Sequence, residues 1–184
     1  MNLKKTARGF TLVELLVVIA IIAILAAVVV LIINPLELTR RTRDASRLTD
    51  LANIQQAINV ALQEGTAAGQ ASPACNSGTP DVTCTDNSII PAGNTTKRLT
   101  NGGGWVSINF AGQSNVTVPT LPVDPTNTTP LHYTYCGSGT HWKIMTHLES
   151  EQQTTAPNDR RANDGGTDPL SYEVGSNMLL ACTY

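Results

Sequence analysis

An unbroken run of 19 apolar residues, Leu15–Ile33, is the feature that most constrains what this chain can fold into. A helix of that length can cross the hydrocarbon core of a bilayer, whereas so long a run without a polar side chain is foreign to a small soluble domain. Extended back to Phe10, the segment has 24 residues and would form a helix about 36 Å long. The sequence therefore predicts a transmembrane helix over residues 10–33 and excludes a simple soluble globule.

The residues before the apolar run carry only positive charge. Lys4, Lys5 and Arg8 lie there without an acidic residue, which predicts a cytoplasmic N-terminus and export of the chain beyond the apolar run. A secretory signal is a poorer explanation, because the run is too long and no small-residue cleavage site comes after it. One acidic residue, Glu14, lies inside the apolar segment, where a carboxylate costs roughly 2.5–3.5 kcal/mol. We therefore expect Glu14 either to have a partner or to lie shallow among lipid headgroups.

The hexapeptide GFTLVE at residues 9–14, with a basic leader before it and an apolar helix after it, resembles the prepilin cleavage and methylation motif. This motif is typical of the type IV pilins and of the pseudopilins of type II secretion. The resemblance implies that residues 1–9 are a leader peptide and that a membrane peptidase cuts between Gly9 and Phe10. It also implies that the same enzyme methylates the new terminus of Phe10. The resemblance is strong over residues 1–64 and looser beyond.

Under this resemblance Glu14 has a role in assembly. Cleavage creates an α-amino group on Phe10, one helical turn from Glu14 in sequence. In a bundle of staggered helices, the amine of one subunit can pair with Glu14 of its neighbour, and the pairing removes the desolvation penalty on both charges. Our hypothesis is that this pairing makes assembly conditional on the correct axial register.

Asn34-Pro35 interrupts the apolar run. Because Pro35 removes a backbone hydrogen bond and clashes with the preceding turn, we expect a kink there, after which the helix continues. Residues 34–64 are predicted to form an amphipathic helical arm that ends at Gly65 as a C-cap. The apolar face of the arm has spacings of three and four residues. Its members are Leu48, Leu51, Ile54, Ile58 and Leu62.

Four arginines cluster early in the arm: Arg40, Arg41, Arg43 and Arg47. One interpretation is that they contact acidic neighbours in a filament or anionic lipid headgroups. The other is that they form a solvated helix face with weak local ion pairs. Direct binding of nucleic acid is not expected, because the net charge of the chain is −2 and no basic domain surrounds the four arginines.

Residues 65–184 are predicted to form an exported globular β domain. It opens with a loop rich in Gly, Pro and Ser, and a Gly-Ser-Gly-Thr hairpin signal lies later in the domain. One amphipathic helix packed on a small antiparallel sheet is the simplest way to bury the apolar face of the arm, so the predicted fold class is α+β. The pilins have this architecture. The strand candidates are residues 105–110, 116–118, 131–136, 141–148, 172–174 and 178–184.

Two further stretches resemble features of the major pseudopilins. LPVDP at residues 121–125 resembles the turn before their sheet, and residues 163–173 resemble the acidic loop after it, which holds calcium in those proteins. The candidate ligands are Asp159, Asp164 and Asp168, because hard oxygen ligands at short spacing suit Ca²⁺. The other interpretation is a solvated turn in which Asp and Gly serve the backbone geometry. A structural role requires no cofactor. The acidic loop suggests calcium as an optional bound ion.

The four cysteines all lie in the predicted exported domain: Cys75, Cys84, Cys136 and Cys182. An even number of cysteines in an exported domain favours disulfides, and three pairings are open. Proximity in sequence favours Cys75–Cys84, which leaves Cys136–Cys182. A zinc site is disfavoured because no C-x₂-C spacing is present.

No enzymatic motif emerges from the sequence. It has no G-x-S-x-G, P-loop or H-E-x-x-H pattern. His132, His141 and His147 lie on or beside strand candidates, where histidine is more often a surface or cross-strand residue than a catalyst. The chain is therefore not expected to be an enzyme.

The sequence indicates a membrane-inserted precursor that becomes a structural subunit of a type IV pilus-like filament or of a type II secretion pseudopilus. The LPVDP turn and the acidic loop favour the pseudopilin, whereas the cysteines and the Thr/Asn-rich loops favour the pilin. The alternative from another class is a membrane-tethered exported binding module that does not polymerise. The expected partners are further copies of the chain or related subunits, the prepilin peptidase, the inner-membrane assembly platform and membrane lipid. The expected location is the inner membrane, and then a periplasmic or cell-surface filament.

Overall fold

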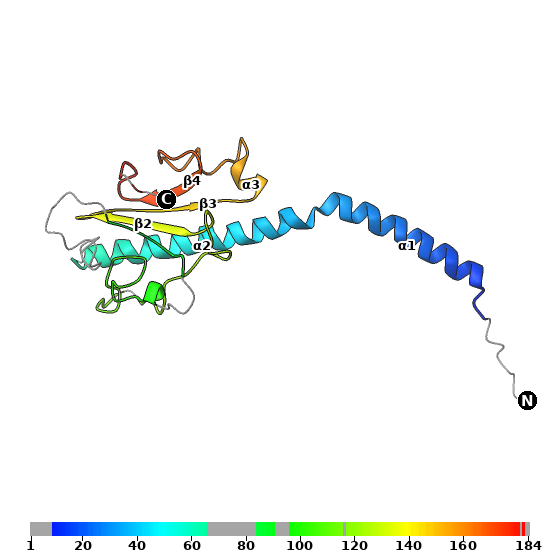
Figure 1. Ribbon diagram of the computed structural model, residues 1–184, viewed down its shortest axis with the longest axis horizontal. Helices are drawn as coiled ribbons and strands as arrows, with labels where there is room; N and C mark the ends of the chain where they lie inside the picture. The colour runs from blue at the N-terminus through cyan, green and yellow to red at the C-terminus, as the bar shows by residue number, and fades with distance from the viewer. Residues whose placement is uncertain (1–8, 66–83, 91–95, 116, 181, 183–184) are drawn as a thin grey trace, which may run out of the picture. The chain divides into compact units, whose positions relative to one another are not determined.

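The computed structural model describes residues 9–65, 84–90, 96–115, 117–180 and 182. The chain divides into two compact units, Met1–Thr39 and Arg40–Tyr184. The first unit contains the apolar helix α1, and the second contains the globular part of the protein (Figure 1).

Helix α1 spans Leu12–Ile33 and, beyond Glu14 in its first turn, is apolar on all sides. Every side chain of α1 that the structure describes is exposed, and residues Leu12–Val30 have a mean hydropathy of 3.2. The helix is therefore long and apolar enough to cross a membrane. An apolar helix with no covering layer of its own requires lipid or another protein to shield it from water.

A single residue separates α1 from the next helix. Asn34 has the left-handed backbone conformation, with φ of 40°, and it is the C-cap of α1. Helix α2 then begins at Pro35, and the side-chain oxygen of Asn34 accepts a hydrogen bond from the amide of Glu37 at 3.4 Å. The helical path is thus interrupted at Asn34, directly before the proline that predicts a kink.

Helix α2 spans Pro35–Gln63 and buries the face that the residue spacing predicts. Leu51, Ile54 and Ile58 are buried in the core, and Leu62 packs against its edge. After α2 ends, the amide of Gly65 donates to the carbonyl oxygen of Leu62 at 3.1 Å, and its φ of 87° is the conformation that glycine adopts readily at a helix end.

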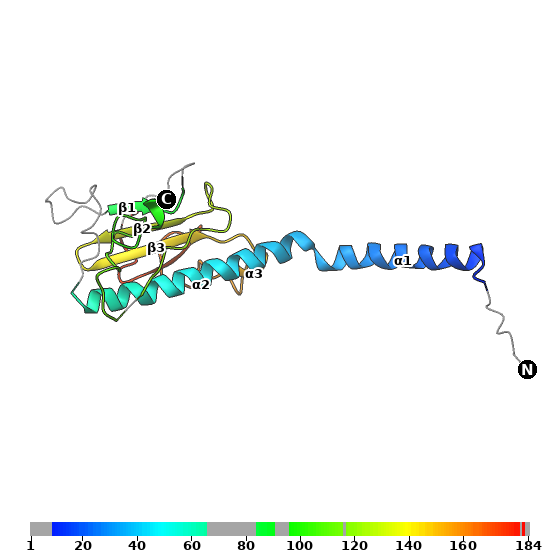
Figure 2. The same cartoon turned by 90° about the horizontal axis from the view of Figure 1, so that it is seen from below.

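The sheet has four antiparallel strands in the order β1-β2-β3-β4. Figure 2 shows β2 and β3 running alongside α2. The hairpin between β2 and β3 turns at Gly139, whose φ is 60°, as the Gly-Ser-Gly-Thr signal predicts. The fold is therefore the α+β class expected from the sequence. The strands are β1 Cys84–Asn87, β2 Tyr133–Ser138, β3 His141–His147 and β4 Ser171–Gly175.

The core between α2 and the sheet is built around aromatic side chains. Trp105 and Tyr133 are fully buried with their ring centroids 5.7 Å apart, and the Tyr133 hydroxyl donates to Asp50 of α2 at 2.8 Å. This contact joins the helix to strand β2. The remaining core members from outside α2 include Val106, Ile108, Phe110, Leu121, Tyr135, Trp142 and Ile144.

Three strand predictions were wrong over their described residues, and three short elements were not predicted. Residues 105–110 form no strand, because their backbone bonds outside the sheet: the Trp105 amide donates to Lys97, which lies in a 3₁₀ helix, and the Phe110 amide to Thr100. Residues 178–180 form a turn. The unpredicted elements are β1, the 3₁₀ helix η2, Thr96–Arg98, and the four-residue helix α3, Glu151–Thr154. All three are polar in sequence and have no apolar periodicity to reveal them. In the candidate 116–118, Thr117 and Val118 are not part of a strand, and Val116 lies outside the described residues.

Candidate functional site

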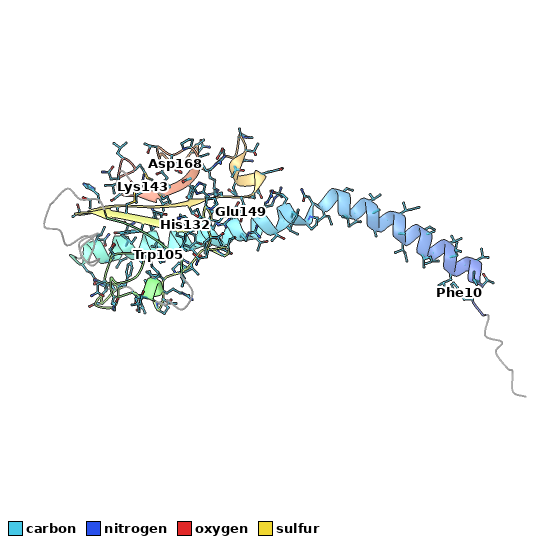
Figure 3. All side chains as sticks on the ribbon, in the orientation of Figure 1. Phe10, Trp105, His132, Lys143, Glu149 and Asp168 are labelled. Atoms are coloured by element: carbon cyan, nitrogen blue, oxygen red, sulfur yellow. A yellow bond between two sulfur atoms is a disulfide. The ribbon has the colours of Figure 1, made fainter. Side chains whose placement is uncertain are left out.

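Residues 9–11, which directly precede α1, are exposed and non-helical. Gly9 has no atom within 4 Å of the position that a Cβ would take, and the side chain of Phe10 is 78% exposed. Helix α1 begins at Leu12, so the peptide bond between Gly9 and Phe10 lies outside the helix (Figure 3). A peptidase can therefore reach this bond without unwinding α1.

Glu14 and Thr11 form a capping box at the start of α1. The Thr11 hydroxyl accepts a hydrogen bond from the Glu14 amide at 3.2 Å, while the Glu14 carboxylate accepts from the Thr11 amide at 2.8 Å and from its hydroxyl at 2.7 Å. Both donors to the carboxylate are uncharged. The capping box therefore orients the Glu14 carboxylate without neutralising its charge, and a cation can still pair with it.

A second site lies in the globular unit, where charged side chains meet beside the N-terminal half of α2. Its members come from α2, from the LPVDP turn and from the segment between β3 and α3. We call this group the charged cluster: Arg43, Arg47, Asp44, Asp124 and Glu149.

Arg47 is fully buried at the centre of the charged cluster. Its guanidinium donates to both oxygens of Asp124, at 2.6 and 2.9 Å, to Asp44 at 2.8 Å and to Glu149 at 2.6 Å. Burial alone would lower the pKa of Arg47, but the hydrogen bonds to these carboxylates outweigh it and raise the pKa. The guanidinium is therefore charged in the folded protein at any working pH.

The carboxylates of the cluster are bonded on their other sides as well. Arg43 makes a two-point contact with Glu149, at 2.7 and 2.8 Å, and this contact lowers the pKa of Glu149, with a further contribution from Arg47. Asp44 accepts from the amide and the hydroxyl of Ser150 at 2.7 and 2.6 Å. The cluster thus ties α2 to the chain that leaves β3.

Asp124 stabilises the LPVDP turn and links it to α2. Its carboxylate accepts from the amides of Thr126 and Asn127, at 2.7 and 3.2 Å, while it also pairs with Arg47. Leu121 of the same turn is fully buried in the core. The turn therefore combines an apolar anchor with a carboxylate that holds α2.

The structure gives different environments to the four arginines of the arm. The side chains of Arg40 and Arg41 are exposed, and those of Arg43 and Arg47 pair with carboxylates of the charged cluster. Sequence reasoning placed Asp44 among the acidic residues near the arginines but did not find the distant partners Asp124 and Glu149. A signal was present for Arg47, because it lies four residues before Leu51 and so falls on the apolar face of α2, where a charge requires a buried partner.

The predicted calcium ligands each bond to protein donors. Asp159 pairs with Arg161, with a shortest separation of 2.8 Å, and the two are only partly exposed. Asp164 accepts from two backbone amides at 2.7 Å, and Asp168 accepts from the Leu170 amide and the Ser171 hydroxyl. Over the part of the chain that the structure describes, no three His, Cys, Asp or Glu side chains are grouped so that they could hold a metal ion.

The four cysteines are described only in part. Cys136 and Cys182 form a disulfide with a Cα–Cα distance of 6.0 Å, which links strand β2 to the C-terminal segment. Cys75 and the side chain of Cys84 lie outside the described residues, and so does the pairing predicted for them.

Together, the exposed apolar helix, which is long enough to cross a membrane, and the small antiparallel sheet give the α+β, pilin-like fold expected from the sequence. Residues 4–30 match the family model of the prokaryotic N-terminal methylation motif, and the chain therefore carries the prepilin-type signal of type IV pilins and pseudopilins. No curated protein and no solved structure matches the chain.

Proposed function

We propose that the chain is a non-catalytic structural subunit of a type IV pilus-like filament or of a type II secretion pseudopilus. The observation that carries the proposal is the methylation motif over residues 4–30, with its scissile bond exposed directly before an apolar helix. Prepilin peptidase removes residues 1–9 on the cytoplasmic side and methylates Phe10. An inner-membrane assembly platform then moves the subunit from the bilayer into the filament.

The exposure of α1 supports this route. Lipid covers the apolar helix before assembly, and the α1 helices of neighbouring copies cover it afterwards. Both surroundings exclude water, so the transfer between them exposes little apolar surface. The globular unit, with its own core and disulfide, remains on the outside.

The outward face of α2 also supports contacts between copies. From Ala45 to Gln63, all of which the structure describes, no exposed side chain of α2 is charged. The Thr49 hydroxyl donates to the carbonyl of Ala45 at 2.9 Å, so part of the polar surface is already bonded within the helix. A surface helix that faces only water usually carries charges. We call this surface the uncharged stripe: Ala45, Thr49, Ala52, Gln56, Asn59 and Gln63.

The proposed role of Glu14 depends on Phe10, which is exposed directly before α1. Cleavage turns the amide nitrogen of Phe10 into a charged amine, and a neighbouring copy can bring its own Glu14 against that amine. An unpaired carboxylate in the apolar filament core would keep its desolvation penalty, so only the register that pairs the two charges is favourable.

The substitution Glu14→Gln tests this function. It keeps the shape and a capping oxygen but removes the charge, so membrane insertion and leader removal should continue while filaments are lost. The matched control is Glu151→Gln, the same change at an exposed position in α3, which should leave assembly intact. Electron microscopy of sheared surface material, with immunoblots of the membrane fraction, measures both. Normal filaments with Glu14→Gln would remove the pairing role.

Two further observations separate the remaining alternatives. A secretin among the gene neighbours favours the pseudopilus, and a retraction ATPase favours the pilus. A membrane-tethered binding module that does not polymerise would yield no filaments from the unaltered chain.

A further inference from the structure

A buried ion pair lies beneath the acidic loop, residues 163–173. The ammonium of Lys143 on β3 lies 2.6 Å from a carboxylate oxygen of Glu173 on β4, and the two side chains are 3% and 0% exposed. Lys143 is opposite Gly175 and Met145 is opposite Glu173, so the charged pair is diagonal on one face of the sheet. Figure 3 shows Lys143 and Asp168 together on the side of the sheet away from Trp105.

The backbone of the acidic loop wraps around the Glu173 carboxylate. The second oxygen of Glu173 accepts hydrogen bonds from the amides of Thr167 and Asp168, at 2.6 and 3.1 Å. A Cβ on Gly166 would overlap this carboxylate, so the close approach of the loop depends on the glycine. The position of the loop is thus set by Glu173.

Lys143 also holds the C-terminal segment. Its ammonium donates to the carbonyl oxygen of Met178 at 3.2 Å, and the disulfide between Cys136 and Cys182 fastens the same segment to β2. The ammonium therefore contacts one carboxylate oxygen and one backbone carbonyl oxygen, which are the two kinds of protein ligand that Ca²⁺ prefers.

The carboxylates predicted to bind calcium do not fit that task. Both oxygens of Asp164 and both oxygens of Asp168 accept hydrogen bonds from protein donors, and Asp159 pairs with Arg161. Calcium at Glu173 would have to displace the Lys143 ammonium, which would then be a buried charge without a partner.

We infer that Lys143 is the built-in cation of the acidic loop, and that the loop closes on this ammonium instead of on calcium. The positive charge arrives with strand β3 as the sheet forms, so closure of the loop is coupled to folding and not to the calcium concentration. The inference stands on the globular unit alone and does not depend on filament assembly.

The direct test is thermal unfolding of the full-length chain in a non-ionic detergent, with calcium, magnesium or a chelator. Trp105 and Trp142 are both buried in the globular unit, so tryptophan fluorescence reports its unfolding. We expect the three midpoints to agree within about 1 °C. A calcium site at a hundredfold excess of calcium over its dissociation constant would raise the midpoint by roughly 5–10 °C, and such a calcium-specific rise would overturn the inference.

A set of variants tests the ammonium itself. Lys143→Met leaves Glu173 buried without a counter-charge, so the midpoint should fall by about 10 °C and the amides of Thr167 and Asp168 should exchange faster with deuterium. Adding Glu173→Gln, which removes the second charge but keeps an acceptor for the loop amides, should recover most of the loss. The control Lys97→Met, at a partly exposed lysine, should shift the midpoint by less than about 2 °C. An unchanged midpoint and unchanged loop exchange in Lys143→Met would contradict the inference.

Discussion

At the scale of single residues, Arg47 joins three parts of the chain that are far apart in sequence. Its partners Asp44, Asp124 and Glu149 come from α2, from the LPVDP turn and from the segment after β3. A buried ion pair adds little net stability over an apolar pair, but the removal of one partner leaves the others buried and uncompensated. The cluster therefore fixes the arrangement of these segments more than it adds to the free energy of unfolding.

Replacement of Arg47 tests this view. Arg47→Met should lower the free energy of unfolding by about 3–5 kcal/mol, because Asp44 and Asp124 lose their counter-charge. The matched control is Arg40→Met, at an exposed position on the same helix, which should change it by less than about 0.5 kcal/mol. Denaturation with urea, followed by the fluorescence of the two buried tryptophans, measures both variants. Equal effects at the two arginines would contradict the assignment.

The burial of two histidines leads us to expect that the free energy of unfolding depends on pH. His132 is buried and His147 is partly buried, and burial lowers the pKa of both below the usual 6.5. As the pH falls through 6.5, the unfolded chain therefore binds protons that the folded chain excludes. The stability contributed by the neutral rings is fully present above that pH and is lost on acidification.

The free energy of unfolding should accordingly fall from pH 7 to pH 5. The double change His132→Gln/His147→Gln should flatten this slope, whatever it does to the stability at neutral pH. His141→Gln, at an exposed position on β3, serves as the control and should keep the slope of the unaltered protein. Urea denaturation at a series of pH values gives these slopes, and the same slope in the double variant and the control would exclude the two buried rings as its source.

At the scale of elements, α2 has two faces with different tasks. One face buries Leu51, Ile54 and Ile58 in the core, and the other presents the uncharged stripe. The helical period separates the two faces, so a substitution on the stripe need not disturb the core.

A charge on the uncharged stripe should block assembly without unfolding the subunit. Gln56→Lys should reduce the filament yield by more than about tenfold, because each 1.4 kcal/mol of lost contact energy changes an association constant tenfold and a buried unpaired charge costs more than that. Gln152→Lys makes the same change at an exposed position in α3 and should leave the yield unchanged. Quantitative microscopy of sheared filaments, with tryptophan fluorescence to confirm folding, compares the two. Full assembly of Gln56→Lys would show that the stripe faces solvent.

At the scale of the whole molecule, the features that depend on local sequence patterns were predicted, whereas those that depend on contacts between distant residues were not. The apolar run predicted α1, the spacing of Leu51, Ile54 and Ile58 predicted the buried face of α2, and the glycines after Cys136 predicted the β2–β3 hairpin. Each of these signals lies within a few residues of the structure that it predicts. Local sequence therefore sufficed for the fold class and for the N-terminal methylation motif that the family model matches.

The remaining features depend on partners far away in the chain. The charged cluster joins residues separated by up to 106 positions, and no local pattern pairs Arg43 with Glu149. Residues 105–110 are largely apolar and buried like a strand, but their backbone pairs with residues 97–101 and not with the four-stranded sheet. The acidic loop resembles a calcium loop in composition, while the cation that lies against it comes from β3. Such contacts are fixed by the tertiary arrangement, which local sequence does not reveal.

The mass of the protein recovered from surface filaments tests the pairing of Phe10 with Glu14 most directly. We expect a chain that has lost residues 1–9 and begins at Phe10 with a methyl group on its α-amine. Intact-mass and N-terminal peptide spectrometry identify both changes in one sample. Filaments built from subunits that still carry the leader would contradict the proposed assembly, because no amine on Phe10 would then exist to pair with Glu14.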